Sequence, residues 1–367
     1  MKTLHVIESG GLYGAEKILL DLAAAQKRCG DDATVLSVGP NGLGEKAIEF
    51  AARERGIVVK PWRMAAGLNL LGMRNIFAWA QAEGFDVFHS HGYRFDTLFA
   101  FADPFGGFAK VSTVHGVTLT SSGSIRTAQR LGLTCLRRMD RVAFVSKKLR
   151  ATYGQHLKNA CVIANGIELQ PIQEVRAQTT SVVEPKERTI EIVSVGRLEY
   201  EKNYSLLLDA VHELVRRDVP CKLTLLGEGR LLDDLQQQKE RLGLSNVHFP
   251  GYSNDVLGTL HSSDVLVFTS TTEGMPVTVI EAMLLGVPIV STAVGGIPEM
   301  VQGYPLAKLT EHHRPTSIAD RIVEACLTEP SRRASQENIQ LMEKRYSSER
   351  MAKEYRDVYV QVRRGST

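Results

Sequence analysis

Residues 269–299, TSTTEGMPVTVIEAMLLGVPIVSTAVGGIPE, predict a loop, a helix, a strand and a second loop. They continue the apolar run DVLVFTS at 264–270, which is typical of a strand buried on both faces of a parallel sheet. We expect Thr278 to cap the helix, with Glu281 three residues later, and Gly286 to end it. Glu273 then lies in the loop and Glu281 in the first helical turn, so both carboxylates flank the end of a buried strand.

These two glutamates allow two interpretations. A helix N-terminus carries a partial positive charge and unpaired N–H groups, so this loop and helix start suit a phosphate or a carboxylate of a ligand. Alternatively, Glu281 completes a capping box and complements the helix dipole, while Glu273 is simply solvated. Taken alone, the stretch favours neither interpretation.

The rest of the chain repeats this alternation of short apolar runs and helical segments, from LHVIES at 4–9 to NVHFPGY at 246–252. Such alternation predicts parallel sheets with right-handed crossovers. Residues 168–188 are polar, include two prolines and are expected to be a linker. We therefore predict an α/β chain of two doubly wound domains, 1–167 and 189–346. Ligands are expected outside the carboxyl ends of the strands, in a cleft where the two domains face each other.

Length and composition are those of a globular protein with more than one core. The chain has 367 residues, of which 43% are apolar and 23% charged. No run approaches the roughly 18 apolar residues of a membrane helix, and MKTLHVIESGG lacks the apolar core of a signal peptide, so a cytoplasmic location is expected. The cysteines are scattered and lack CxxC spacing, which predicts reduced thiols and neither zinc nor disulfides: Cys29, Cys135, Cys161, Cys221 and Cys326.

Basic residues are concentrated in the first half of the chain. Residues 1–167 hold 21 Lys and Arg against 13 Asp and Glu, although the whole chain has a net charge of only +3. Within 126–158, nine basic residues accompany a single acid, Asp140. A basic helical stretch interleaved with leucines can bind an anionic membrane surface. An ordinary solvated basic face over a core stripe explains the pattern equally well.

A second strand-end loop, in VGRLEYEKN at 195–203, carries a pair of cations. Arg197 and Lys202 follow a predicted strand, and Gly196 allows a close backbone approach, so the loop suits a diphosphate. Exposed loop cations are usually only solvated. The diphosphate interpretation is favoured because the same predicted domain has further strand-end loops, namely LLGEG and the loop with Glu273 and Glu281.

The first glycine turn, SGGLYGAE at 9–16, partly matches the dinucleotide fingerprint G-x-G-x-x-G. Ser9 replaces the first glycine, while Gly11 and Gly14 fit the others. The second strand, ATVLSVG, has no acidic residue at its end to hold a ribose, so a nicotinamide-dependent dehydrogenase is disfavoured. A phosphate near Gly10 and Gly11 is still compatible with this turn.

Three histidines follow strands in the first half. His89 and His91 can point the same way, but no third ligand follows at metal spacing, so a metal site is disfavoured. His115 precedes Gly116, which lets another group approach. A ligand-binding role and that of a hydrogen-bonded strand-end histidine are both open for His115.

In their order and spacing these motifs resemble the retaining glycosyltransferases of family 4. The matching pieces run nearly end to end: SGGLYGAE, DVFHSHG, TVHG, VAFVSK, VIANGI, VGRLEYEKN, LLGEG, VHFPGY, the Glu273–Glu281 element with EAMLLGVPIVSTAVGG, and IPE at 297–299. Leu12 and Tyr13 are an insertion relative to the shorter SGGAE form of the family. The resemblance implies the GT-B fold, in which two Rossmann-like domains face each other across a cleft. It also implies that a C-terminal helix, about 347–364, crosses back to the acceptor-side N-terminal domain.

The resemblance implies roles residue by residue. Arg197 and Lys202 would hold the donor diphosphate and stabilise the leaving group, Glu281 would bind the ribose and Glu273 the transferred sugar, and His115 would lie beside that sugar. The implied catalytic residues are therefore His115, Arg197, Lys202 and Glu273. The implied donor-binding set is Gly11, Gly14, Gly196, Arg197, Lys202, Tyr252, Glu273, Gly274, Met275, Pro276 and Glu281, with Gly295 and Gly296 in the donor-side loop.

The implied reaction moves a hexose or 6-deoxyhexose from a nucleotide-diphosphate sugar to a glycan or lipid-linked acceptor, with retention of configuration, in polysaccharide biosynthesis. No metal or other cofactor is expected, since Asp-x-Asp, the commonest sequence sign of a metal-held sugar nucleotide, is missing. No nucleic-acid partner is expected, and the basic 126–158 stretch would place the enzyme on the cytoplasmic face of a membrane. Two alternatives are a sugar-nucleotide epimerase of the same fold and a non-catalytic sugar-nucleotide-binding protein.

Overall fold

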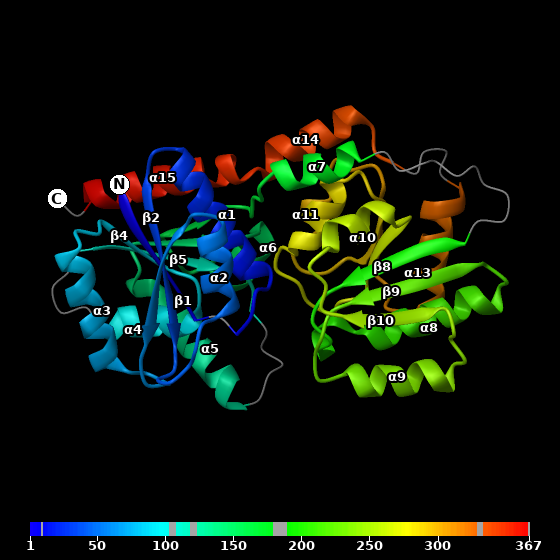
Figure 1. Ribbon diagram of the computed structural model, residues 1–367, viewed down its shortest axis with the longest axis horizontal. Helices are drawn as coiled ribbons and strands as arrows, with labels where there is room; N and C mark the ends of the chain where they lie inside the picture. Colours follow the sequence, from blue (N-terminus) through cyan, green and yellow to red (C-terminus); the bar gives the residue numbers. More distant parts are fainter. Residues whose placement is uncertain (9, 103–107, 118–122, 179–188, 329–332, 366–367) are drawn as a thin grey trace. The chain divides into compact units, whose positions relative to one another are not determined.

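The computed structural model describes residues 1–8, 10–102, 108–117, 123–178, 189–328 and 333–365. The chain divides into two compact units, one of Met1–Glu168 with Tyr346–Thr367 and one of Leu169–Arg345 (Figure 1). Each unit is built on its own parallel sheet, with helices in the connections between strands. Parallel strands are buried on both faces, which is why they appear in the sequence as short continuous apolar runs.

The first sheet has seven strands in the order β3-β2-β1-β4-β5-β6-β7, all paired in parallel. The strand order reverses direction between β1 and β4, where His5 and His89 are register partners. The strands are β1 (Lys2–Glu8), β2 (Asp32–Gly39), β3 (Val58–Arg63), β4 (Val87–Ser90), β5 (Ala109–Val114), β6 (Arg141–Phe144) and β7 (Ala160–Val162).

The helices of this unit include a C-terminal helix that returns to it. In helix α15 (Ser348–Gly365) the buried side chains include Met351, Tyr355 and Tyr359, and the helix packs against α1 and β5. This confirms the predicted return of the last helix. The other helices are α1 (Gly14–Arg28), α2 (Ala47–Glu54), α3 (Leu70–Ala82), α4 (Tyr93–Ala102), α5 (Gly123–Cys135), the 3-10 turn η1 (Leu136–Arg138) and α6 (Lys147–Tyr153).

The second sheet has six strands in the order β10-β9-β8-β11-β12-β13, again all parallel. Its order reverses between β8 and β11, the kind of position at which open α/β sheets bind ligands. Its strands are β8 (Ile190–Val195), β9 (Cys221–Leu226), β10 (Val247–Gly251), β11 (Val265–Phe268), β12 (Ile289–Thr292) and β13 (Ala307–Thr310).

Apolar helix faces cover this sheet. Leu207, Val211 and Leu214 of α8 are fully buried in one core cluster with strand residues of β8, β9 and β11. The helices of this unit are α7 (Gln170–Ala177), the 3-10 turn η2 (Tyr200–Lys202), α8 (Tyr204–Arg216), α9 (Leu232–Arg241), α10 (Val256–Ser262), α11 (Val277–Leu284), α12 (Ile297–Met300), α13 (Pro315–Val323), the π-helical turn η3 (Glu324–Thr328) and α14 (Gln336–Tyr346).

Two local predictions are wrong. Helix α11 begins two residues earlier than expected, with Pro276 and not Thr278 as its N-cap, so Glu281 is the fifth helical residue and no capping box forms. A proline ring fixes φ near −65°, which suits this position without any side-chain acceptor. Residues 168–188 are also not all linker, because Gln170–Ala177 forms helix α7, which packs against α10. Residues 179–188 lie outside the described part of the chain.

The expected basic helical stretch at 126–158 is also wrong as a single element. Its residues are divided among α5, η1, β6, α6 and the segments that connect them. The basic side chains therefore do not share one helix face, and these residues do not form a single amphipathic helix of the kind that binds a membrane surface.

Candidate active site

The loops that follow β8, β11 and β12 are joined to one another where the second sheet reverses its order. The Thr271 amide donates to the Glu201 carbonyl over 2.8 Å, and the Thr269 hydroxyl donates to the Asn203 carbonyl over 3.0 Å. Across the next strand pair, the Thr292 hydroxyl donates to the Ser270 carbonyl over 2.7 Å. These bonds fix the three loops as one surface at the carboxyl ends of the strands.

Lys202 and Glu273 form an ion pair within this surface. Lys202 Nζ lies 2.7 Å from Glu273 Oε1, and the two side chains are only 15% and 8% exposed. The Ser270 hydroxyl donates to the same carboxylate oxygen over 2.6 Å. Glu273 is therefore a paired, hydrogen-bonded carboxylate, and the interpretation of Glu273 as a solvated loop residue is wrong.

Arg197 lies in the loop after β8 but in a different environment. Its Nη2 atom lies 2.9 Å from Glu201 Oε1, and its side chain is 48% exposed. An exposed pair of this kind contributes little to stability and leaves the guanidinium free to reorient. Arg197 can thus turn toward an anion at small energetic cost, whereas Lys202 is held in place.

Two glycines allow the loops to approach this closely. Gly295, at a φ of +54°, lies so near Glu273 that a β-carbon added to it would be 1.8 Å from the Glu273 carbonyl oxygen. A β-carbon on Gly196 would meet the Tyr204 hydroxyl at 2.7 Å. The Gly296 amide also donates to the Gly274 carbonyl over 3.1 Å, so the loop after β12 is tied to the one after β11.

The start of helix α11 borders the same surface. Met275 is buried, and Pro276 directly precedes the first helical residue. Because a proline N-cap offers no side-chain acceptor, the helix N-terminus is suited to an anion from outside the helix. Glu281 is buried in the second turn of α11, and not in the first turn as expected.

Tyr252 lies further along the sheet. It directly follows β10, the edge strand, and its side chain is 49% exposed. Two backbone bonds connect that edge to the site: the Gly227 amide donates to the Gly251 carbonyl over 2.8 Å, and the Gly196 amide donates to the Leu226 carbonyl over 2.9 Å. Tyr252 therefore belongs to the same row of strand ends, two strands away from Arg197.

The remaining candidates belong to the first unit. Gly11 lies in the turn after β1, and Gly14 is the first residue of α1, while Ser9 lies outside the described residues. His115 directly follows β5, and its Nε2 atom is 3.1 Å from His91 Nδ1. Burial lowers the pKa of His115 to about 4, so its imidazole is neutral at pH 7.

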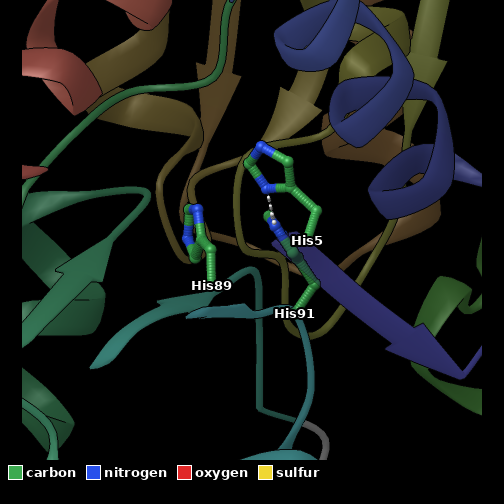
Figure 2. A group of neighbouring side chains, drawn as sticks. All are labelled: His5, His89 and His91. Atoms are coloured by element: carbon green, nitrogen blue, oxygen red, sulfur yellow. Dashed lines mark hydrogen bonds between the residues drawn. The ribbon is translucent and has the colours of Figure 1, made fainter. Parts of the chain in front are cut away.

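Sequence spacing missed a third histidine beside His89 and His91. His5 lies in the middle of β1, the neighbour of β4, and Figure 2 shows the three imidazoles gathered together. Their closest ring nitrogens all lie within 4.8 Å of one another, close enough to be considered for a metal ion. The signal was the neighbouring position of the two strands in the sheet and not any spacing along the chain.

These three histidines are already hydrogen-bonded on all six ring nitrogens. His5 bonds to His91 and Gln26, His89 bonds to Tyr359 and Thr113, and His91 also bonds to His115. Burial also lowers the pKa of each of the three imidazoles well below its usual value. A metal ion bound to one nitrogen of each ring would have to displace at least two of these bonds, so the cluster is better suited to hydrogen bonding than to metal binding.

Models of two known protein domains match the chain, one over each half. The model described as Glycosyltransferase Family 4 matches residues 13–171, and the model described as Glycosyl transferases group 1 matches residues 176–342. The chain belongs to glycosyltransferase family 4. The resemblance drawn from the sequence motifs is thereby confirmed.

Relatives of this family 4 glycosyltransferase include proteins of similar length. It is 25% identical to the uncharacterized glycosyltransferase MJ1178 of Methanocaldococcus jannaschii over 77% of each chain. It is 26% identical to the N-acetyl-alpha-D-glucosaminyl L-malate synthase of Bacillus anthracis, over 78% of this chain and 77% of that one. These relatives support a glycosyltransferase activity.

Among solved structures, Anabaena HepE in complex with UDP-glucose has a TM-score of 0.80 to this glycosyltransferase. The identity is 20%, and the match covers 98% of this chain and 100% of that one. The likeness confirms the predicted fold class, GT-B, with two Rossmann-like units. Within the described part of the chain, no helix combines the length and apolar character that crossing a bilayer requires.

Proposed function

We propose that this glycosyltransferase moves a hexose or 6-deoxyhexose from a nucleotide-diphosphate sugar to a hydroxyl of a glycan or lipid-linked glycan, with retention of anomeric configuration and without a metal ion. The observation that carries the proposal is the joined surface after β8, β11 and β12, where two cations and a helix N-terminus gather in a member of this family. The UDP-glucose in Anabaena HepE supports a nucleotide sugar as the donor.

In this proposal the cations receive the leaving group. Lys202 is held by Glu273, and Arg197 is free to turn, so the pair would bind the donor diphosphate and stabilise the charge that develops on its terminal phosphate. The N-terminus of α11 would add its partial positive charge. Buried Glu281 would bind the ribose, with the backbone of Gly274, Met275 and Pro276 lining the donor and Tyr252 at its far end.

Glu273 is proposed as a ligand of the transferred sugar and not as a nucleophile. A retaining glycosidase uses a free carboxylate about 5 Å from its partner to attack the anomeric carbon. Glu273 is instead engaged by Lys202 and Ser270 through the same oxygen, which lowers its nucleophilicity while its other oxygen can accept a sugar hydroxyl. His115 is proposed to bind another hydroxyl of that sugar.

The proposed chemical step is a displacement on one face of the sugar. The bond from the anomeric carbon to the leaving phosphate oxygen breaks, and the acceptor oxygen bonds to the same face of that carbon. The acceptor proton passes to the leaving phosphate, so atoms and charge balance without another base. The products are the glycoside and a nucleoside diphosphate.

The first experiment screens donors and then identifies the product. Thermal-shift titrations with UDP-, GDP- and dTDP-sugars select the donor, and incubation with glycans, lipid-linked glycans and L-malate tests the acceptor. NMR of the new glycosidic bond gives the anomeric configuration, and a reaction in EDTA tests whether activity requires a divalent metal ion. Inversion of configuration, or loss of activity that only a divalent metal restores, would refute the corresponding part of the proposal.

Two further arms separate the alternatives. Conversion of the donor sugar without any acceptor would establish an epimerase, and donor binding without turnover on any acceptor would establish a binding protein. A covalent sugar adduct trapped on Glu273, or on any other carboxylate, would overturn the single-face displacement. Flotation with anionic liposomes tests membrane association, and binding that does not weaken with salt would argue against the basic 126–158 segment as its cause.

A further inference from the structure

A buried chain of hydrogen bonds runs through the first unit and ends at His115. It begins at the Gln26 side-chain oxygen in α1, which lies 2.7 Å from His5 Nε2. His5 Nδ1 lies 3.0 Å from His91 Nε2, the bond drawn in Figure 2, and His91 Nδ1 lies 3.1 Å from His115 Nε2. One amide is thus connected in series to three imidazoles, one in β1 and the others directly after β4 and β5, the next two strands of the sheet.

Burial keeps these imidazoles neutral at physiological pH. His5 is fully buried and His91 nearly so, and loss of hydration disfavours the charged ring. The pKa values of His5 and His115 are lowered to about 4, and that of His91 lies well below its usual value. Each ring therefore carries a single N–H, with one nitrogen donating and the other accepting.

In a chain of neutral imidazoles, one end determines the direction of every bond. The Gln26 oxygen can only accept, so His5 donates from Nε2 and accepts at Nδ1. His91 must then donate from Nε2 to His5 and accept at Nδ1. His115 in turn donates from Nε2 to His91, which leaves its Nδ1 without a proton.

A second set of bonds accompanies this orientation of the Gln26 amide. Its nitrogen lies 3.5 Å from the Tyr359 hydroxyl of α15, to which it donates, and that hydroxyl donates to His89 Nδ1 over 2.7 Å. His89 then donates from Nε2 to the Thr113 hydroxyl, also over 2.7 Å. In the structure the amide oxygen faces His5, and with the protons placed in this way every donor of this set has an acceptor.

We propose that Gln26, His5 and His91 are positioning residues that hold His115 as the Nε2–H tautomer, so that its Nδ1 accepts a hydrogen bond from a ligand hydroxyl. His115 Nδ1 is buried and has no hydrogen-bond partner among the described residues. A buried acceptor without a partner is unfavourable, and a hydroxyl that donates to it relieves this. The ligand assignment, a hydroxyl of the transferred sugar, rests on the proposed function.

The tautomers can be measured directly on the full-length protein without any sugar. In protein labelled with ¹⁵N-histidine, two-bond ¹H–¹⁵N spectra distinguish the Nε2–H from the Nδ1–H ring, and single histidine substitutions assign the signals. We expect His5, His91 and His115 all to be Nε2–H, with exposed His156 as the reference for a ring averaged by solvent. A wild-type His115 that carries its proton on Nδ1, or that averages both forms, overturns the proposal.

Substitution of Gln26 tests whether its amide sets the direction of the hydrogen bonds between the three imidazoles. Gln26→Met removes the acceptor at similar length, so the His115 signal should change to a mixture of tautomers, and kcat/KM should fall about tenfold, the worth of one hydrogen bond. Gln81→Met, at an exposed glutamine of α3, is the matched control and should leave the His115 tautomer and kcat/KM unchanged. An unchanged His115 tautomer in folded Gln26→Met overturns the proposal, and if that variant fails to fold the wild-type spectrum alone decides.

A deoxy donor series connects the tautomer to the sugar. The donor analogue that lacks the bound hydroxyl should be turned over equally by wild type and Gln26→Met, whereas the parent donor should show the tenfold difference. A tenfold difference that persists for every deoxy analogue overturns the acceptor role. Absence of any sugar transfer would refute the proposed function but not the tautomer assignment, because the latter is read without substrate.

Discussion

Removal of either partner of the Lys202–Glu273 pair should cost much more stability than removal of both. At 2.7 Å the attraction is about 6 kcal/mol in a medium of effective dielectric constant near 20, before the desolvation of the two ions is subtracted. Desolvation of several kcal/mol offsets most of this attraction, but a single substitution leaves one buried charge without its partner. We therefore expect Lys202→Met to lower the free energy of unfolding of the second unit by about 3 kcal/mol.

The assay is a double-mutant cycle followed by calorimetry. Lys202→Met and Glu273→Gln are each compared with the double variant, and a loss of about 3 kcal/mol corresponds to roughly 6–12 °C in the melting temperature of a unit of this size. The double variant should recover about half or more of the loss, because a buried pair is often replaceable by uncharged side chains. Activity should be lost in all three.

Arg197→Ala is the matched control, because its partner Glu201 lies in the same loop but Arg197 is half exposed. This variant should cost less than about 1 kcal/mol of stability and still lower turnover by orders of magnitude. A Lys202→Met variant as stable as Arg197→Ala, or a double variant that shows the simple sum of the two single losses, would refute the buried ion pair as the cause.

Two further variants test other buried features. Burial raises the pKa of Asp96 to about 7, so the folded state favours its protonated form, and the free energy of unfolding should fall by about 4 kcal/mol as pH rises from 4 through 7. Asp96→Asn should flatten that part of the pH–stability curve, and equal slopes for the two proteins would contradict the assignment. Gly295→Ala should destabilise the second unit and raise the KM for donor, because its β-carbon would overlap the Glu273 carbonyl. Gly303→Ala is the control, since Gly303 shares the positive φ but its β-carbon would meet only Leu341, at 3.8 Å. Equal losses of stability in the two variants would exclude the overlap as the cause.

The sequence was sufficient to predict the sheets because parallel strands are recognisable without tertiary information. Runs such as DVLVFTS are apolar on both faces, and the loops that follow them carried most of the candidate residues. Local rules were less reliable at the start of α11, where Thr278 has the chemistry of a cap. Pro276 takes that position instead, with the extended backbone of an N-cap and a φ of −65°.

Contacts between distant segments were beyond sequence reasoning. The pairing of Lys202 with Glu273 joins residues 71 apart, and His5 meets His91 across 86 residues. No spacing rule covers such pairs, since the sheet order brings them together. The helix at Gln170–Ala177 was missed for another reason: it is only eight residues long, half of them polar, and its packing against α10 stabilises it.

Both units place buried polar groups where their strand order reverses. Different interactions offset the desolvation of these groups in each unit. In the second unit Lys202 and Glu273 satisfy each other as ions, and in the first His5 and His89 occupy neighbouring strands as neutral rings. Replacing a buried ion pair such as Lys202–Glu273 by well-packed apolar side chains often leaves a core equally stable. The ion pair presents charge next to a helix N-terminus, and in the proposed tautomer the histidine chain leaves His115 Nδ1, after β5, as an acceptor without a partner among the described residues. Both arrangements are better explained by a charged, hydroxyl-rich ligand than by a contribution to folding.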